Sequence, residues 1–123
     1  MRRRIGDGWG RLRDRAVWSW EGFRHVLATE RSLGQWLWAN AASAGLALAL
    51  PLTPGERAAI LMGGVFVLAL ECLNTAVERL VDDVSEARRP RAKQAKDAGS
   101  AAVALAGVAV AVAWLAALGR MLW

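Results

Sequence analysis

The chain has 123 residues, of which 55% are hydrophobic, and its formal net charge is +5. A single small domain cannot bury that much apolar surface in a soluble core, so the composition argues against a soluble globular protein and for a membrane protein. We expect an all-α membrane protein that forms one domain over residues 1–123.

An amphipathic helix is predicted over about residues 7–33. Its apolar side chains recur every three or four residues, which at about 100° per residue keeps them within roughly 80° of one another. They are Trp9, Leu12, Ala16, Trp20, Phe23 and Leu27. Such a helix lies in the membrane interface, with its apolar face in the lipid and its arginines against anionic headgroups.

Three membrane-spanning helices are expected next, over residues 35–52, 57–81 and 97–119. The third is the clearest, because residues 98–118 contain no charge and would span about 30 Å at about 1.5 Å per residue. The first contains Asn40 and Ser43 and ends in the turn sequence PLTPGE. The second crosses a bilayer only if it continues through Glu71, so it carries polar residues at membrane depth.

The positive charges are divided unequally between the two ends of these helices. Eight of the 16 Lys and Arg residues precede the first span and six lie at 79–97, which leaves only Arg57 and Arg120 for the other side. The positive-inside rule therefore predicts a cytoplasmic N-terminus, a cytoplasmic 79–97 loop and a C-terminus outside the cytoplasm. This distribution argues against nucleic acid as a partner.

Small residues in the third span favour self-association. They form a stripe of Ala102, Ala106, Ala109 and Ala113, which permits close contact between helices. Three thin helices that carry polar groups bury little surface on their own, so we expect a homo-oligomer.

The polar residues of the second span share one face. With Glu71 at 0° on a helical wheel, Asn74 falls at about 300°, Glu78 at about 340° and Asp82 at about 20°. If Arg79 marks the membrane border, Glu71 lies about 12 Å deeper. A carboxylate at that depth costs several kcal/mol, so it indicates a functional site. We interpret Glu71 as a base for a hydroxyl at the membrane edge and Glu78 as a ligand of a hydrated divalent cation.

Two simpler interpretations stand beside this one. Glu71 and Asn74 would serve only to join helices, and the basic loop EARRPRAKQAKDAGS would be only the positive-inside signal. The same loop, facing a carboxylate pair, also suits a nucleoside triphosphate with its metal. The sequence contains neither a Walker A pattern nor the protein-kinase signatures, so such a nucleotide site would be of an unusual kind.

Three motifs resemble those of the prokaryotic diacylglycerol kinases, a family of small membrane lipid kinases. ECLNTAVE at 71–78 fits the pattern E-x-L-N-[ST]-A-[IV]-E, and AKDAGSAAV at 95–103 fits AKD-x-GSAAV. WSWEGFR at 18–24 looks like the aromatic-Ser-Trp-x-Gly-x-Arg start of that family. The resemblance runs from about Arg11 to Trp114. It implies a homotrimer in the bacterial cytoplasmic (inner) membrane, with active sites shared between neighbouring subunits.

The resemblance also implies an activity, the transfer of the γ-phosphate of MgATP to the primary hydroxyl of diacylglycerol to give phosphatidic acid. In that reaction Glu71 looks like the catalytic base, Asn74 supports the polar cluster, and Glu30 with Glu78 looks like the pair that holds Mg²⁺. The implied nucleotide-site residues are Arg11, Trp18, Glu30, Glu78, Lys96 and Asp97. The implied lipid-site residues are Arg11, Ser19, Trp20, Arg24, Arg57, Glu71, Ser100 and Trp114.

The sequence departs from the family pattern at three places. Trp18 stands where well-known members have Tyr; its ring could still stack on the nucleotide, but a hydroxyl contact is lost. Trp36 replaces a carboxylate, so a polar role at that position is lost. Arg88 and Arg89 replace side chains of other types, and the nucleotide contacts of those side chains cannot be assigned to them.

Three other functions stay open. The first is undecaprenol kinase, a sister branch with the same catalytic motif and an isoprenoid acceptor, although DAGSAAV looks more like the diacylglycerol branch. The second is a small proton-coupled exporter, which would use Glu71 but leave Glu30, Asn74 and Glu78 without a role. The third is a membrane-surface scaffold, which explains only the amphipathic helix and the basic charge.

Overall fold

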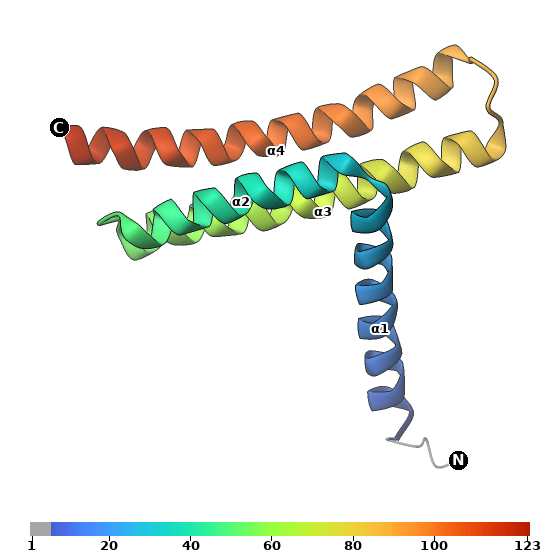
Figure 1. Ribbon diagram of the computed structural model, residues 1–123, viewed down its shortest axis with the longest axis horizontal. Helices are drawn as coiled ribbons and strands as arrows, with labels where there is room; N and C mark the ends of the chain where they lie inside the picture. The colour runs from blue at the N-terminus through green and yellow to red at the C-terminus, as the bar shows by residue number, and fades with distance from the viewer. Residues whose placement is uncertain (1–5) are drawn as a thin grey trace.

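The computed structural model describes residues 6–123, and this part of the chain is all α-helical (Figure 1). The helices are α1 (Gly6–Thr29), α2 (Arg31–Ala49), α3 (Pro54–Val84) and α4 (Pro90–Leu122). No strand occurs within residues 6–123, so the prediction of an all-α protein is confirmed.

The first helix ends four residues before its predicted end at residue 33. Glu30 has φ −116° and ψ 119°, an extended conformation that separates α1 from α2. The Glu30 carboxylate accepts a hydrogen bond from Arg79 of α3 at 3.1 Å. Because of this break, α1 runs across the direction that the other three helices share (Figure 1). Residues 31–33 therefore belong to α2, which the pattern of apolar residues alone did not predict.

The ends of α3 and α4 follow from local capping signals. Thr53 and Glu56 form a capping box at the start of α3, in which the Glu56 backbone N–H donates to Thr53 Oγ1 at 3.3 Å. Pro90 begins α4 seven residues before the predicted start at 97, because its fixed φ suits the first position of a helix. The basic residues just before the apolar stretch of α4 are therefore helical.

The middle helix, α3, packs against both α2 and α4. The close approach depends on small residues: a Cβ on Gly64 would overlap Asn40 of α2, and a Cβ on Gly63 would lie 2.8 Å from a Val110 methyl group of α4. A large side chain joins α2 and α4 directly elsewhere in the bundle: Trp114 Nε1 of α4 donates to Ser43 Oγ of α2 at 2.9 Å. The three helices thus form a thin bundle.

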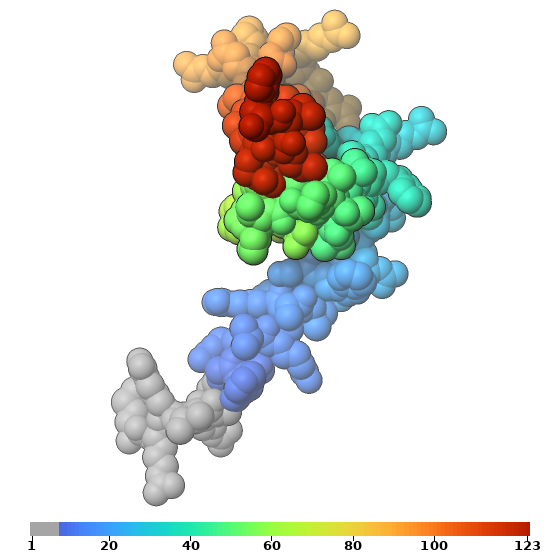
Figure 2. Space-filling model, turned by 90° about the vertical axis from the view of Figure 1, so that its left-hand side faces the viewer, coloured from blue at the N-terminus to red at the C-terminus, as the bar shows by residue number. Residues whose placement is uncertain are grey.

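An ion pair closes the end of this bundle that carries the α2–α3 turn. Arg120, near the end of α4, donates to the Glu56 carboxylate at 2.6 and 3.0 Å and to the carbonyl of Pro51 at 3.3 Å. The Arg120 side chain, and after it the Thr53 backbone N–H, lowers the pKa of Glu56 to about 2. Figure 2 views the molecule from this end, with the last residues of α4 against the α2–α3 turn.

Two helices in the described part of the chain, α3 and α4, are long and apolar enough to cross a membrane. The shorter α2, which includes Gln35, Asn40 and Ser43, is not one of them. Large apolar side chains point outward along both candidates, including Phe66 at 61% exposed and Leu105 at 69% exposed. Lipid or further protein is required to cover these faces.

Candidate active site

A polar pocket of about 320 Å³ lies between α2, α3 and α4. All three helices contribute to its wall. The lining residues are Ser32 and Trp36 from α2, Glu71, Asn74 and Glu78 from α3, and Ser100, Val103 and Ala104 from α4. The polar face of α3 is therefore turned toward its two neighbours, and Ser100 of the AKDAGS motif lies opposite it.

The pocket contains buried groups that are expensive to remove from water. Glu71 is only 4% exposed and Asn74 is 9% exposed. The Asn74 Nδ2 donates to Glu78 Oε1 at 3.2 Å, whereas its Oδ1 is buried and accepts no hydrogen bond from any described residue. Buried polar atoms are normally paired, so this unpaired oxygen is an exception within the described residues.

A glycine allows α4 to approach this amide. A Cβ on Gly99 would overlap the Asn74 Oδ1 atom. In the Ala-Gly-Ser sequence after Asp97, the glycine thus packs against the Asn74 amide of α3, and the serine that follows it lines the pocket. The two sequence motifs meet in space at this point.

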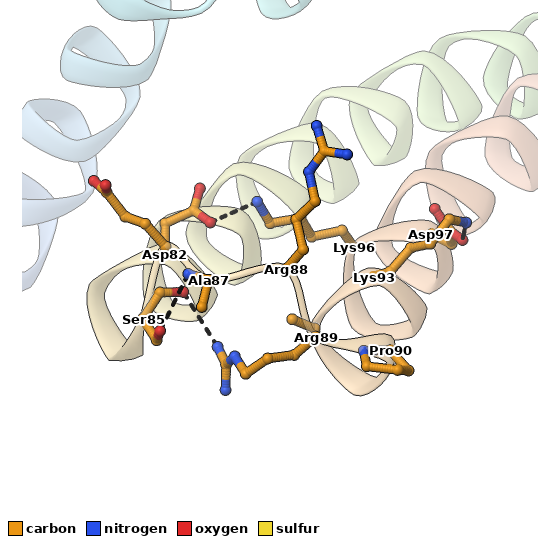
Figure 3. Close-up of a pocket in the computed structure, with 11 residues that line it drawn as sticks. Asp82, Ser85, Ala87, Arg88, Arg89, Pro90, Lys93, Lys96 and Asp97 are labelled. Atoms are coloured by element: carbon orange, nitrogen blue, oxygen red, sulfur yellow. Dashed lines mark hydrogen bonds and ion pairs between the residues drawn. The ribbon is translucent and has the colours of Figure 1, made fainter.

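A second hollow of about 550 Å³ lies where α3 ends and α4 begins (Figure 3). Charged residues dominate its lining. Lys96 Nζ donates to Asp82 Oδ1 at 2.6 Å, and Lys93 pairs with Asp97 one turn further along α4. Arg89 donates to the carbonyls of Val81 and Ser85, both at 3.3 Å, and so holds the loop against the end of α3.

The two hollows lie about one helical turn apart. Glu78 lines the first and Asp82 the second, four residues along α3, and Ser100 and Lys96 are related in the same way on α4. Four residues correspond to about 6 Å along a helix. A hollow lined by charged side chains of both signs thus adjoins an acidic pocket deeper in the bundle.

Comparison with known proteins identifies the family to which this arrangement belongs. Residues 17–118 match the family described as prokaryotic diacylglycerol kinase. The chain belongs to this family. It is 35% identical to a diacylglycerol kinase of Pseudomonas aeruginosa over 107 residues, which are 87% of each chain. It is 29% identical to that of Escherichia coli over 107 residues, 87% of this chain and 88% of the relative.

The similarity to an undecaprenol kinase is more local. The chain is 47% identical to the undecaprenol kinase of Bacillus subtilis over 49 residues, which are 40% of this chain and 38% of the relative. Membership of the diacylglycerol kinase family makes this protein a membrane lipid kinase. The exporter and scaffold interpretations are therefore set aside, and ATP use is implied.

The two predicted metal ligands, Glu30 and Glu78, accept hydrogen bonds from different residues. Glu30 accepts from Arg79, which also donates to Thr29 Oγ1, and Glu78 accepts from Asn74. Glu30 does not line the pocket at Glu71. Within the described residues no group of three or more His, Cys, Asp or Glu residues could hold a metal ion. Magnesium is commonly held by one or two carboxylates plus substrate phosphates, so two such residues suffice for a nucleotide-bound ion.

The α1 residues with predicted roles lie away from the pocket of their own chain. They are Arg11, Trp18, Ser19, Trp20 and Arg24, all exposed. The Ser19 hydroxyl donates to the Arg15 carbonyl at 2.8 Å. Because α1 projects from the bundle (Figure 1), none of the five lines either hollow.

Two other predicted lipid-site residues lie in the opposite half of the bundle. Arg57 Nε donates to the Ala47 carbonyl at 2.8 Å and so holds the end of α2. It precedes Glu71 by 14 residues, about 21 Å along a helix. Trp114 follows Ser100 by the same number of residues and bonds to Ser43. Their observed contacts join helices.

Four residues that line the pocket were not among the predicted site residues, namely Ser32 and Trp36 of α2 and Val103 and Ala104 of α4. A signal was present in the sequence: Ser32, Trp36, Asn40 and Ser43 are spaced four, four and three residues apart, which places them on one face of a helix. The departure from the family pattern at Trp36 predicts only the loss of a polar role at that position. The structure instead places it in the pocket wall.

Proposed function

We propose that this kinase transfers the γ-phosphate of MgATP to the primary hydroxyl of diacylglycerol in the pocket between α2, α3 and α4, forming phosphatidic acid. The observation that carries this proposal is Glu71, a carboxylate 4% exposed that lines a polar pocket one turn from a hollow with four basic side chains in its lining. The deeper pocket takes the acceptor hydroxyl, and the hollow at the loop takes the nucleotide phosphates.

Glu71 acts as the general base. The acceptor oxygen forms a bond to the γ-phosphorus while the bond from that phosphorus to ADP breaks, and Glu71 takes the hydroxyl proton. A base must reach that proton within about 2.6–3.2 Å, and a pocket of about 320 Å³ around the carboxylate leaves room for such a contact. Asn74 supports the polar cluster, because its Nδ2 donates to Glu78 Oε1 at 3.2 Å and so holds that carboxylate in the pocket wall.

The nucleotide requires cations, and the first turns of α4 supply them. Lys96 exchanges its bond with Asp82 for a phosphate oxygen, as a point charge. Asp97 pairs with Lys93 and keeps that lysine beside the hollow. Phosphoryl transfer is catalysed mainly by positioning and charge neutralisation, so a few well-placed charged groups are sufficient.

Magnesium fits the carboxylates present. Glu78 and Glu30 would hold it, with Arg79 leaving Glu30 when the metal and phosphates arrive. When bound, the ion would neutralise charge on the transferred phosphoryl group. Carboxylate oxygens are the ligands that Mg²⁺ prefers, which supports this assignment.

The proposed assembly is a homotrimer in the bacterial cytoplasmic membrane. In it α2, α3 and α4 all cross the bilayer, with the N-terminus and the α3–α4 loop in the cytoplasm and α1 in the interface. The 19 residues of α2 cover about 28 Å at about 1.5 Å per residue, close to a hydrocarbon core of about 30 Å. A projecting α1 supports a shared site, because its Arg11, Trp18 and Arg24 would reach the pocket of a neighbouring subunit.

The test is a transfer assay in mixed micelles with purified protein, labelled γ-phosphate, and either diacylglycerol or undecaprenol as acceptor. Labelled phosphatidic acid as the main product supports the proposal, and undecaprenyl phosphate moves the chain to the sister activity. Glu71→Gln should lower kcat by about 10²–10⁴-fold. Glu21→Gln, at an exposed position on α1, is the matched control and should retain activity. A fully active Glu71→Gln enzyme would remove Glu71 as the base.

A further inference from the structure

One wall of the acceptor pocket is formed by a large aromatic ring. Trp36 is the only aromatic residue among those that line it; the others from α2 and α4 are Ser32, Ser100, Val103 and Ala104. None of the three family-related motifs, at 18–24, 71–78 and 95–103, includes position 36, so they assign no role to this residue. Its size makes Trp36 the side chain that sets the shape of the pocket.

The indole reaches across to α4. A Cβ on Gly107 would lie 3.3 Å from the Cη2 atom of Trp36, a contact that is tight even for a methyl group. The backbones of α2 and α4 are not in contact with each other, as each packs on α3. The ring therefore closes a gap between the two helices that no backbone contact closes.

The position of the ring along the bundle follows from the pairs that meet across α3. Gly64 meets Asn40 of α2, and Gly63 meets Val110 of α4. Trp36 lies four residues before Asn40, and Gly107 lies three residues before Val110, so both lie nearer the α3–α4 loop than these pairs do. They remain about one turn, roughly 5.4 Å, farther from that loop than Glu71. The ring is thus on the membrane-interior side of the proposed base. A lipid whose hydroxyl reaches Glu71 must direct its chains past this ring.

We propose that Trp36 is a specificity-determining residue, whose indole against Gly107 limits the room beside the acceptor hydroxyl and so discriminates lipids by their substitution on the adjacent carbon. This inference rests on the proposed function. Apolar walls discriminate modestly, by about 10–200-fold per methylene-sized difference, so the effect should appear as a changed preference and not as a loss of catalysis.

The test compares dioctanoylglycerol with monooctanoylglycerol, which lacks the acyl chain on the carbon next to the primary hydroxyl. In Trp36→Ala the ratio of kcat/KM for the two acceptors should rise about tenfold in favour of dioctanoylglycerol. Gly107→Ala should lower the same ratio, because the new methyl group pushes the indole into the pocket. In the Trp36→Ala background Gly107→Ala should have no effect on the ratio, since no ring remains to be pushed.

Trp38→Ala is the matched control, because Trp38 is on the same helix but 80% exposed, and its ratio should equal that of the wild type. Trp36→Phe, a smaller ring, should give an intermediate ratio and serves if the alanine variant does not fold. An unchanged ratio in active Trp36 variants overturns this inference alone. A wild-type enzyme that phosphorylates no lipid overturns the proposed function, and the inference with it.

Discussion

Replacing Gly99 by alanine tests whether the contact between α4 and the amide of Asn74 is as close as the structure indicates. A Cβ at this position would overlap Asn74 Oδ1 inside the pocket. Either α4 must move away or the amide must rotate, and rotation would break the 3.2 Å bond to Glu78. Both changes disturb the acceptor pocket.

The magnitude follows from two opposed terms. Alanine is favoured over glycine within a helix by about 1 kcal/mol, and forcing extra atoms into a packed site costs about 1–3 kcal/mol. Gly119 on the same helix has no atom within 4 Å of a built Cβ, so Gly119→Ala gains the first term without the second. Gly99→Ala should therefore be less stable than Gly119→Ala by about 1–3 kcal/mol.

Unfolding of both variants in detergent by increasing denaturant measures the difference, and the transfer assay measures the effect on kcat. Asn74→Ala removes the obstructing amide, so in that background Gly99→Ala should become as favourable as Gly119→Ala. Equal stability of the two glycine variants in the wild-type background, with full activity in Gly99→Ala, would refute the reasoning about this contact.

Two further results are expected. Lys96→Gln should raise the KM for ATP and have a smaller effect on the KM for lipid, measured by varying each substrate in turn. An unchanged KM for ATP would show that Lys96 does not bind the nucleotide phosphates. Because Arg120 lowers the pKa of Glu56 to about 2, their pair should stabilise the fold above pH about 4.5, the ordinary value of a glutamate, and lose its effect as the pH falls toward 2. Melting temperatures in detergent should show this loss in the wild type and not in Glu56→Gln, and identical pH profiles would contradict it.

The sequence by itself determined the helical class, the polar face of α3 and the family. Helical periodicity places Glu71, Asn74 and Glu78 on one face whatever packs against it, and the motifs at 71–78 and 95–103 are contiguous in the chain. Both are local properties that require no knowledge of neighbours. For the same reason the capping box at Thr53 and Glu56 could be identified from residue types alone.

Only the tertiary structure decided where α1 ends and which residues complete the pocket. No glycine or proline marks the break at Glu30; there the carboxylate is held by Arg79, a residue 49 positions away. Trp36 lines the pocket because α2 packs on α3 in a register set by Gly64 and Asn40, and its ring finds space at Gly107 of α4. Such contacts between distant residues depend on how helices dock, and hydrophobic periodicity within one helix carries no information about docking.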